Sequence, residues 1–282
     1  MKKSSLLLLL VAGLCACESS EKGRDKHSHV QSIGQPSEVV LILDNAVLNS
    51  DLKDSLEDML TVNVPGLNQG EDFFRMSRIP TSMDKGEFKR MHSRVLVKVD
   101  NTVKQPTVGI ATDIMAAPQV QVQISTPNVN ALRGYVSSHG DYIRQLVLDN
   151  QLSIQASFLA KHHSAELYKD LKEVLGYTVE APEEIKFTKK GKDFVWGSSR
   201  TAEKQLNMVF YTRPYFGPNI ADVRELVMLR DSVMMENIPG SQPDQWMETV
   251  WEGENPVVTA KERELDGRMI TEMRGLWQMR NG

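Results

Sequence analysis

The sequence contains little cysteine, no long hydrophobic run and no excess of basic charge. Only two cysteines occur in 282 residues. Both, Cys15 and Cys17, lie near the N-terminus, so the rest of the chain has neither a disulfide framework nor a cysteine-ligated metal. No apolar run reaches the roughly 18 residues of a membrane-spanning helix. A net charge of −4 gives no basic surface for nucleic acid, so we expect no nucleic-acid partner.

The residues that are present suit an ordinary globular protein. Hydrophobic residues make up 40% and charged residues 25% of the chain, which excludes disordered and collagen-like classes. The length permits one large or two small domains, with enough chain to bury a core.

The first 16 residues are typical of a bacterial lipoprotein signal peptide. A charged start, Lys2-Lys3, precedes the short apolar segment Leu6–Leu14. The segment Leu14–Cys17 resembles a lipobox, with leucine at −3, small Ala16 at −1 and cysteine at +1. The resemblance implies cleavage after Ala16 and attachment of diacylglyceryl and a palmitate-like acyl chain to Cys17. The alternative is an ordinary signal peptide, in which Cys17 is incidental.

Residues 17–37 are expected to be the lipidated cysteine and a flexible polar tether. We therefore expect an exported protein, lipid-anchored in the bacterial cell envelope at the outer membrane, whose lipid on Cys17 makes the membrane a partner. His27 and His29 are spaced to chelate metal, but a solvated tether offers no further ligands. We expect neither a metal site nor a cofactor.

Residues 38–282 are expected to form an α+β globular region of mainly antiparallel sheet with packed helices. Apolar runs and alternation predict strands at 39–43, 73–79, 94–99, 108–112, 120–124, 177–179, 194–196 and 206–211. Helices are expected at 51–60, within 128–176 with a break near 139–141, and from a cap at Pro218-Asn219 to Asn237. The region is expected to be either a single unit or two similar β-α-β halves, 38–127 and 177–282, with the helical region 128–176 between them.

A weak internal repeat is the reason to consider two halves. Both Val39–Phe74 and Met208–Trp251 contain an apolar strand, an amphipathic helix, a Pro-Gly pair and an aromatic strand. The alternative is chance, because Pro-Gly commonly follows a helix.

Four short motifs follow one another in a fixed order. They are Val64–Gln69, Phe194–Trp196, Arg230–Val233 with Ile238–Gly240, and Arg274–Trp277. With the lipobox in front, they resemble an uncharacterised lipoprotein family of Bacteroides-like bacteria, classed as a domain of unknown function. The resemblance runs from about residue 38 to the end, and implies an exported, lipid-anchored α+β protein without an assigned activity.

The C-terminal segment is expected to be an unfinished sheet edge. Residues 269–279 alternate like a strand packed on one side, and Asn281-Gly282 is a common hairpin turn. Members of the family that the chain resembles continue into another glycine-rich strand, and this chain does not. The alternative is a natural end with a frayed tail.

Catalytic motifs are scarce. The sequence has no G-x-S-x-G, H-E-x-x-H, Walker or G-x-G-x-x-G motif. Two S-x-x-K matches, at Ser50 and Ser82, lack the partner motifs of penicillin-recognising enzymes, and Ser50 is better explained as a helix cap. His162 and His163 are adjacent, so they cannot close one metal site from the same helix face. His139 is expected in a helix break.

Arg230 and Asp231 are the first candidate binding residues. They lie on an expected helix beside apolar neighbours, where a charge must be paired or hydrogen-bonded. One interpretation is a structural tie to a strand backbone. The other is a clamp for an anionic ligand, formed with Arg224 or Arg213.

Trp246 and Trp251 are the second candidates. Together with Tyr211 and Tyr215 they could line a cleft that stacks against sugars, although aromatic residues at strand spacing more often pack in a core.

The function expected from these features is a non-catalytic envelope lipoprotein that binds a partner protein or a glycan. The alternative is an envelope hydrolase acting on a polymer such as a glycan or peptidoglycan, with carboxylates and His139 in a cleft. Two carboxylates about 5–10 Å apart in a cleft would favour the hydrolase.

Overall fold

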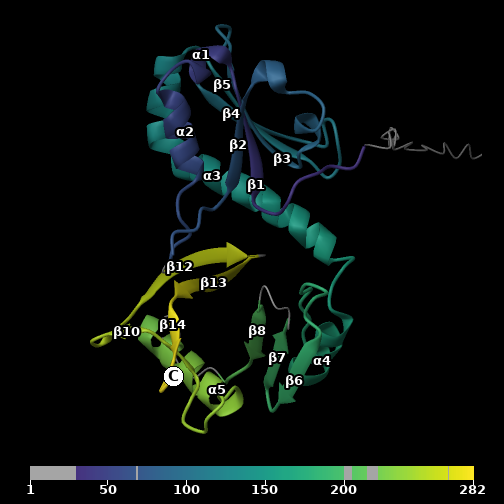
Figure 1. Ribbon diagram of the computed structural model, residues 1–282, viewed down its shortest axis with the longest axis vertical. Coiled ribbons are helices and arrows are strands. Elements are labelled where there is room, and N and C mark those ends of the chain that lie inside the picture. The colour runs from purple at the N-terminus through teal and green to yellow at the C-terminus, as the bar shows by residue number, and fades with distance from the viewer. Residues whose placement is uncertain (1–29, 68, 200–204, 215–221, 266) are drawn as a thin grey trace, which may run out of the picture.

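The computed structural model describes residues 30–67, 69–199, 205–214, 222–265 and 267–282. The expected signal peptide and Cys17 lie outside these residues. An N-terminal region (30–159) contains one five-stranded sheet, and a C-terminal region (160–282) contains several small sheets (Figure 1). The long helix α3 (Val129–Leu159) leads from the first region to the second. The fold is α+β, as expected, and most strand pairs are antiparallel.

The five-stranded sheet itself is mostly parallel. Its order is β2 (Arg75–Pro80), β1 (Glu38–Leu43), β3 (Ser93–Val99), β5 (Val120–Thr126) and β4 (Thr107–Thr112). Only the β4–β5 pair is antiparallel. The continuous apolar run of β1 fits this arrangement, because parallel strands are covered on both faces.

Helices cover one face of this sheet. They are α1 (Asn45–Leu48), α2 (Leu52–Leu60) and α3, and between them and the strands lies the main core, which includes Leu41, Leu56 and Leu132. None of the helices in the described part of the chain is both long and apolar enough to cross a membrane.

Two 3-10 turns, Thr81–Met83 and Phe88–Arg90, and the segment 30–37 accompany the other face. The backbone N–H of Ile33 donates to the carbonyl of Arg90 at 2.9 Å, and that of Ser32 donates to the carbonyl of Ala117 at 3.2 Å. The expectation that the flexible tether extends to residue 37 is therefore wrong, because residues 30–37 belong to the folded region.

Helix α3 corrects another expectation. It runs without a break through His139 and Gly140. Gly140 lies against the side chain of Met59, where a Cβ atom would be 3.1 Å from Met59 Cγ, so this glycine serves close packing on α2 and does not end the helix. The break lies instead at residues 160–164. Ser164 then caps α4 (Ala165–Leu175) by accepting a hydrogen bond from the Leu167 N–H.

Helix α4 packs on an antiparallel sheet of β6 (Phe187–Gly191), β7 (Phe194–Ser198) and β8 (Asn207–Tyr211). The strand expected at 177–179 is a loop, and Val179 packs against the small core of this region instead of pairing. The expected strand is wrong because the apolar contact of Val179 is made from a loop, while Tyr177 is exposed.

The last elements are α5 (Val223–Asn237), β9 (Met247–Thr249), β10 (Trp251–Glu252), β11 (Asn255–Pro256), β12 (Val258–Leu265), β13 (Arg268–Gly275) and β14 (Trp277–Met279). Asp222 caps α5, accepting from the N–H of Arg224 at 2.8 Å. The expected cap at Pro218-Asn219 lies outside the described residues.

Strand pairing does not show the expected repeat. β1 and β2 are parallel neighbours, whereas β8 pairs with β7 and β9 pairs with β14.

Residues 269–279 form an interrupted edge, since β13 pairs with β12 and β14 with β9. Their apolar side chains include exposed Met269 and Trp277.

Candidate functional site

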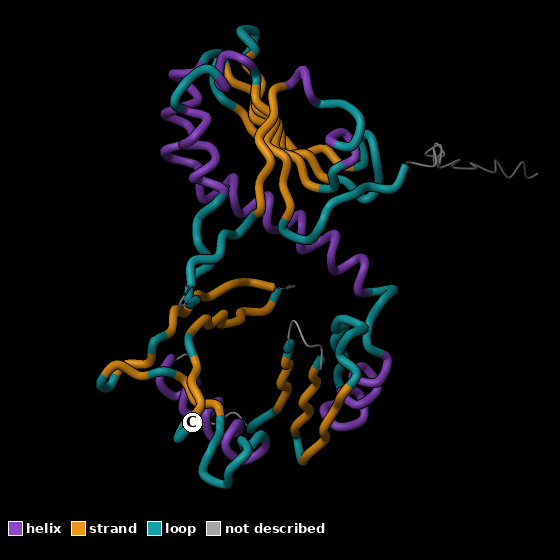
Figure 2. The backbone as a smooth tube through the Cα atoms, viewed as in Figure 1, coloured by secondary structure: helices purple, strands orange, loops and turns teal. Residues whose placement is uncertain are grey.

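A cavity of about 420 Å³, which we call the junction cavity, lies where the two regions meet. The loop after α2 contributes residues 64–67, and the C-terminal region contributes residues from β8, α5, β9, β12, β13 and β14. Figure 2 shows this loop descending toward the C-terminal strands. The lining residues are Val64, Pro65, Gly66, Leu67, Tyr211, Leu226, Val227, Arg230, Thr249, Val258, Met273, Arg274, Gly275, Leu276 and Trp277. Three of the four sequence motifs therefore meet at one place.

Two glycines permit the close packing around this cavity. Gly66 has φ +85°, and a Cβ atom there would lie 3.0 Å from the backbone carbon of Arg274. At Gly275 a Cβ atom would lie 2.4 Å from Val258 Cγ1. Larger residues would separate the loop from β13 or β13 from β12.

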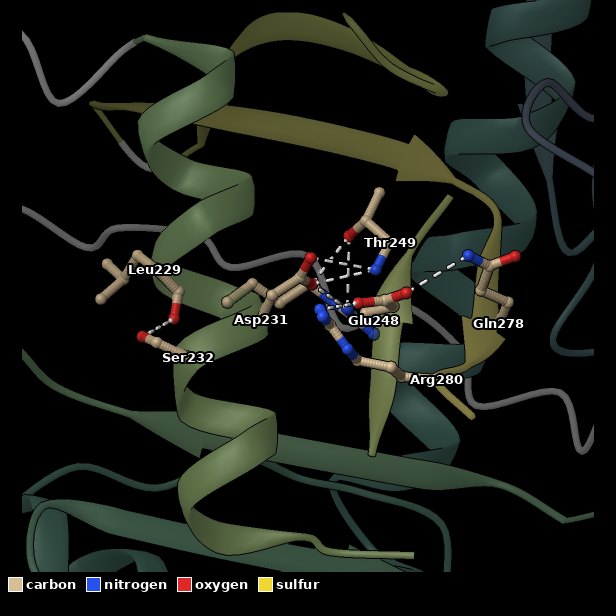
Figure 3. A network of polar contacts seen from close by, with 8 residues as sticks. Leu229, Asp231, Ser232, Glu248, Thr249, Gln278 and Arg280 are labelled. Atoms are coloured by element: carbon tan, nitrogen blue, oxygen red, sulfur yellow. Dashed lines mark hydrogen bonds and ion pairs between the residues drawn. The ribbon is translucent and has the colours of Figure 1, made fainter. Parts of the chain in front are cut away.

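Asp231 ties α5 to β9, as one of the two sequence interpretations proposed (Figure 3). Its carboxylate accepts a hydrogen bond from the Thr249 N–H at 3.1 Å and from Thr249 Oγ1 at 2.9 Å. Arg230 Nη1 donates to Asp231 Oδ1 at 2.6 Å and to Thr249 Oγ1 at 3.3 Å. The two charges therefore stabilise the helix–strand contact and hold each other in place.

A second carboxylate joins β9 to β14. Glu248 accepts hydrogen bonds from Gln278 Nε2 at 3.3 Å and from Arg280 Nη1 at 3.2 Å (Figure 3). Because Gln278 follows Trp277, this pair of contacts fixes the strand that carries the tryptophan.

Arg230 lines the cavity with part of its guanidinium still available. Its Cζ lies 4.2 Å from the ring centroid of Trp277, a distance typical of a cation–π contact. Nη1 is used by Asp231 and Thr249, whereas neither Nε nor Nη2 has a hydrogen-bond partner within the described residues. The side chain is 21% exposed, so solvent and ligands can reach it.

The lining of the cavity is apolar and cationic. Arg230 and Arg274 are its charged residues, and no aspartate or glutamate is among the lining side chains of the described chain. Burial raises the pKa of Tyr211, against the opposing effect of Arg230 and Arg213. The phenol is therefore protonated at neutral pH and can donate a hydrogen bond.

The other two predicted arginines do not join Arg230 in a clamp. Arg213 pairs with Glu236 at 3.2 Å, and Arg224 lies 3.9 Å from Glu254. Neither lines the cavity. The expectation that Arg213 or Arg224 forms a clamp with Arg230 is therefore wrong, because each of these exposed arginines has its own carboxylate partner.

Trp246 and Trp251, the two predicted tryptophans, do not line the cavity either. The guanidinium of Arg280 covers the ring of Trp246 at 4.9 Å, and that of Arg224 covers Trp251 at 5.7 Å. Tyr215 lies outside the described residues. The cavity is lined instead by Trp277 and Tyr211. The sequence does not reveal Trp277 as a cavity residue, because the alternation of residues 269–279 places it on the packed side of one continuous strand. The strand is interrupted before Trp277, and the side chain is 61% exposed.

His139, His162 and His163, all in the described part of the chain, show no catalytic arrangement. His139 is exposed on α3, stacked on Tyr135 at 4.1 Å, and does not line the cavity. His163 Nδ1 lies 3.1 Å from the carbonyl of Leu159, and His162 Nδ1 lies 3.7 Å from Glu183. Among the described residues there is no group of three or more side chains placed to hold a metal ion.

The serines of the two S-x-x-K matches have local roles. Ser50 Oγ accepts a hydrogen bond from the Leu52 N–H at 3.3 Å, although the N-cap position of α2 is held by Asp51 and not by Ser50. Ser82 lies in the 3-10 turn Thr81–Met83.

Comparison with known families divides the chain at the end of α3. Residues 32–159 match the model of a family described as a domain of unknown function (DUF8532). Residues 164–282 match a second family, also described as a domain of unknown function (DUF4837). No curated protein matches the chain, and no solved structure matches it. The cavity therefore lies between two adjoining segments that each match an uncharacterised family.

Proposed function

We propose that the protein is a non-catalytic, lipid-anchored protein of the bacterial cell envelope that binds a segment of a partner protein in the junction cavity. The observation that carries this proposal is the cavity itself. Motifs from both regions converge on it, and they present Arg230, Trp277 and Tyr211 together. Arginine, tryptophan and tyrosine are the residues that most often dominate protein recognition.

A protein segment fits the cavity better than a glycan. Its volume lies in the usual range for ligand sites, about 300–1,000 Å³. Most of its walls are aliphatic or backbone, which favours apolar side chains over hydroxyl groups. The two tryptophans expected to stack on sugars are each covered by an arginine.

The hydrolase alternative receives no support from the site geometry. A glycosidase-like mechanism needs two carboxylates facing one cleft. Among the described residues that line the cavity there is no carboxylate, and His139 lies on a helix face elsewhere. We therefore propose binding and no catalysis.

The membrane anchor rests on the sequence alone. Without the thiol of Cys17 no acceptor for the lipid remains, so Cys17→Ala should release the protein from membranes, whereas Cys15→Ala should not. Fractionation of cells that express each variant measures this. Equal membrane retention of both variants would contradict the anchor.

Binding at the cavity can be tested by photo-crosslinking in intact cells. A benzophenone amino acid is placed at Leu67, which lines the cavity, or at Met83, in the N-terminal region and equally exposed at 48%. We expect an adduct of defined mass from position 67 and none from position 83. Adducts of equal yield from both positions, or none from position 67, would contradict the proposal.

A further inference from the structure

Arg230 has the geometry of a carboxylate receptor. Asp231 and Thr249 hold Nη1, and Trp277 covers one face of the guanidinium, so its orientation is fixed before any ligand arrives. The Nε and Nη2 N–H groups have no partner within the described chain. They form the edge that can bind a carboxylate with two parallel hydrogen bonds.

The charge balance of the site favours an anion. Both oxygens of Asp231 already accept hydrogen bonds from Thr249, so this carboxylate is committed to its structural role. Arg274, the other cationic lining residue, is bound to Glu272 through Nε only. A carboxylate in the cavity would therefore lie beside Arg230, and among the described lining residues there is no aspartate or glutamate to repel it.

The apolar lining of the cavity indicates that the ligand carries an apolar group as well as a negative charge. Leu226, Val227, Val258, Met273 and Leu276 line the same cavity. An inorganic anion would leave the exposed part of this apolar lining in contact with water, whereas an apolar group attached to the anion would cover it. The ligand chemistry that satisfies both halves of the site is a carboxylate directly beside an apolar group.

Building on the proposed function, we infer that the cavity binds the carboxyl-terminal end of a peptide whose last side chain is apolar. The α-carboxylate pairs with Arg230, and the last side chain packs between the aliphatic walls and Trp277. A chain end suits a cavity of about 420 Å³ because its carboxylate and its side chain share one Cα atom. A fatty acid has the same two groups, so the test includes one.

The test is calorimetric titration of the purified protein with three ligands. They are a hexapeptide ending in leucine with a free carboxylate, the same peptide as its carboxyl-terminal amide, and decanoate. We expect the free acid to bind at least about tenfold more tightly than the amide, because a charge-assisted bidentate contact is lost in the amide. Arg230→Gln should remove this preference, and the matched Arg213→Gln, outside the cavity, should retain it.

Arg230→Lys serves as a second variant that keeps the charge beside Asp231. Lysine lacks the planar fork, so the preference for the acid should fall although the melting temperature stays close to that of the parent. Equal affinity for acid and amide would overturn the inference but leave peptide binding intact. Binding of decanoate alone would also overturn it. Absence of all binding together with a retained Leu67 crosslink would overturn the inference and not the proposed function.

Discussion

The two regions of the chain are built in different ways. The N-terminal region has one five-stranded sheet with a large apolar cluster on its helical face and a smaller one on the other. The C-terminal region has sheets of two or three strands and a much smaller apolar cluster. Both regions expose large apolar side chains, among them Phe158 in the first and Met269 and Trp277 in the second. The two regions therefore differ in the size of the buried apolar core.

Polar cross-links take over part of the structural role in the C-terminal region. Asp231 joins α5 to β9, and Glu248 joins β9 to β14. Glu272 binds Arg263 at 2.9 Å and Arg274 at 2.6 Å within the β12–β13 hairpin. The N-terminal region has a buried ion pair as well, Arg94–Asp84 at 2.7 Å. The comparison therefore teaches that lost volume should cost more in the N-terminal region, whereas the C-terminal region, with its smaller core, depends more on its hydrogen bonds.

The largest expected loss of stability follows the truncation of a buried side chain in the N-terminal core. Leu41→Ala should lower the free energy of unfolding by about 3–5 kcal/mol, because Leu41 is fully buried in the large cluster. Leu167→Ala, fully buried in the smaller cluster, should cost about 2–3 kcal/mol. Urea denaturation measures both, with exposed Leu152→Ala as control. A larger loss for Leu167→Ala would break the comparison.

The next effect concerns the tie between α5 and β9. Asp231→Ala removes the acceptor for the Thr249 N–H and leaves Arg230 without its carboxylate. We expect a loss of about 2–3 kcal/mol, below that of a fully buried pair because Asp231 is 17% exposed. Glu236→Ala, which removes the exposed partner of Arg213, should change stability by less than about 0.5 kcal/mol. A loss for Asp231→Ala as small as that for Glu236→Ala would show that the tie is not structural.

Gly66→Ala tests whether the loop is held against the C-terminal strands. Gly66 and Gly176 both have positive φ, +85° and +77°, but of the two only Gly66 has neighbouring atoms within 4 Å of the position that a Cβ atom would occupy. Alanine should cost about 1 kcal/mol at Gly176 from the backbone alone. At Gly66 it should cost about 1–2 kcal/mol more, since the loop must move away from Arg274. Thermal melts of both variants measure the difference, and equal losses would mean that the close approach is absent in solution.

The smallest expected effect depends on pH. Hydrogen bonds from Arg263, and then from Arg274, lower the pKa of Glu272 below its usual 4.5. Its stabilising contribution is therefore present above about pH 4.5 and is lost as the pH falls through the lowered pKa. Glu272→Gln should cost less than about 1 kcal/mol at pH 7, because these groups are partly exposed, and nothing at the acid end. A loss that does not change with pH would assign the effect to packing.

The sequence predicts elements well where burial determines the pattern. The apolar run of β1, the alternation of β5 and the helical stripe of α2 each match the structure, because these segments are covered by the core. The hairpin of β12 and β13 was incompletely predicted, since β12 is mostly exposed and carries four charged residues among eight. The parallel pairing of β1 with β2 and β3 depends on chain reversals that local patterns do not specify.

The site was only partly predictable for the same reason. The tie of Asp231 to a strand follows from a charge placed among apolar helix neighbours, a local signal. The cavity requires residues 64–67 to meet residues 273–277, far along the chain, and no local pattern reports that contact. Trp277 could be recognised as a binding residue only once the interruption at Leu276 was known.

The most direct test of the junction cavity as the binding site is fluorine NMR of protein labelled with 5-fluorotryptophan. The chain has four tryptophans, and Trp277→Phe assigns the signal of the residue beside Arg230. On titration with the leucine-ended peptide, the Trp277 signal should shift and those of Trp246 and Trp251 should stay. An unchanged Trp277 signal, with shifts at Trp246 or Trp251 on adding the peptide or a chito-oligosaccharide, would contradict the account.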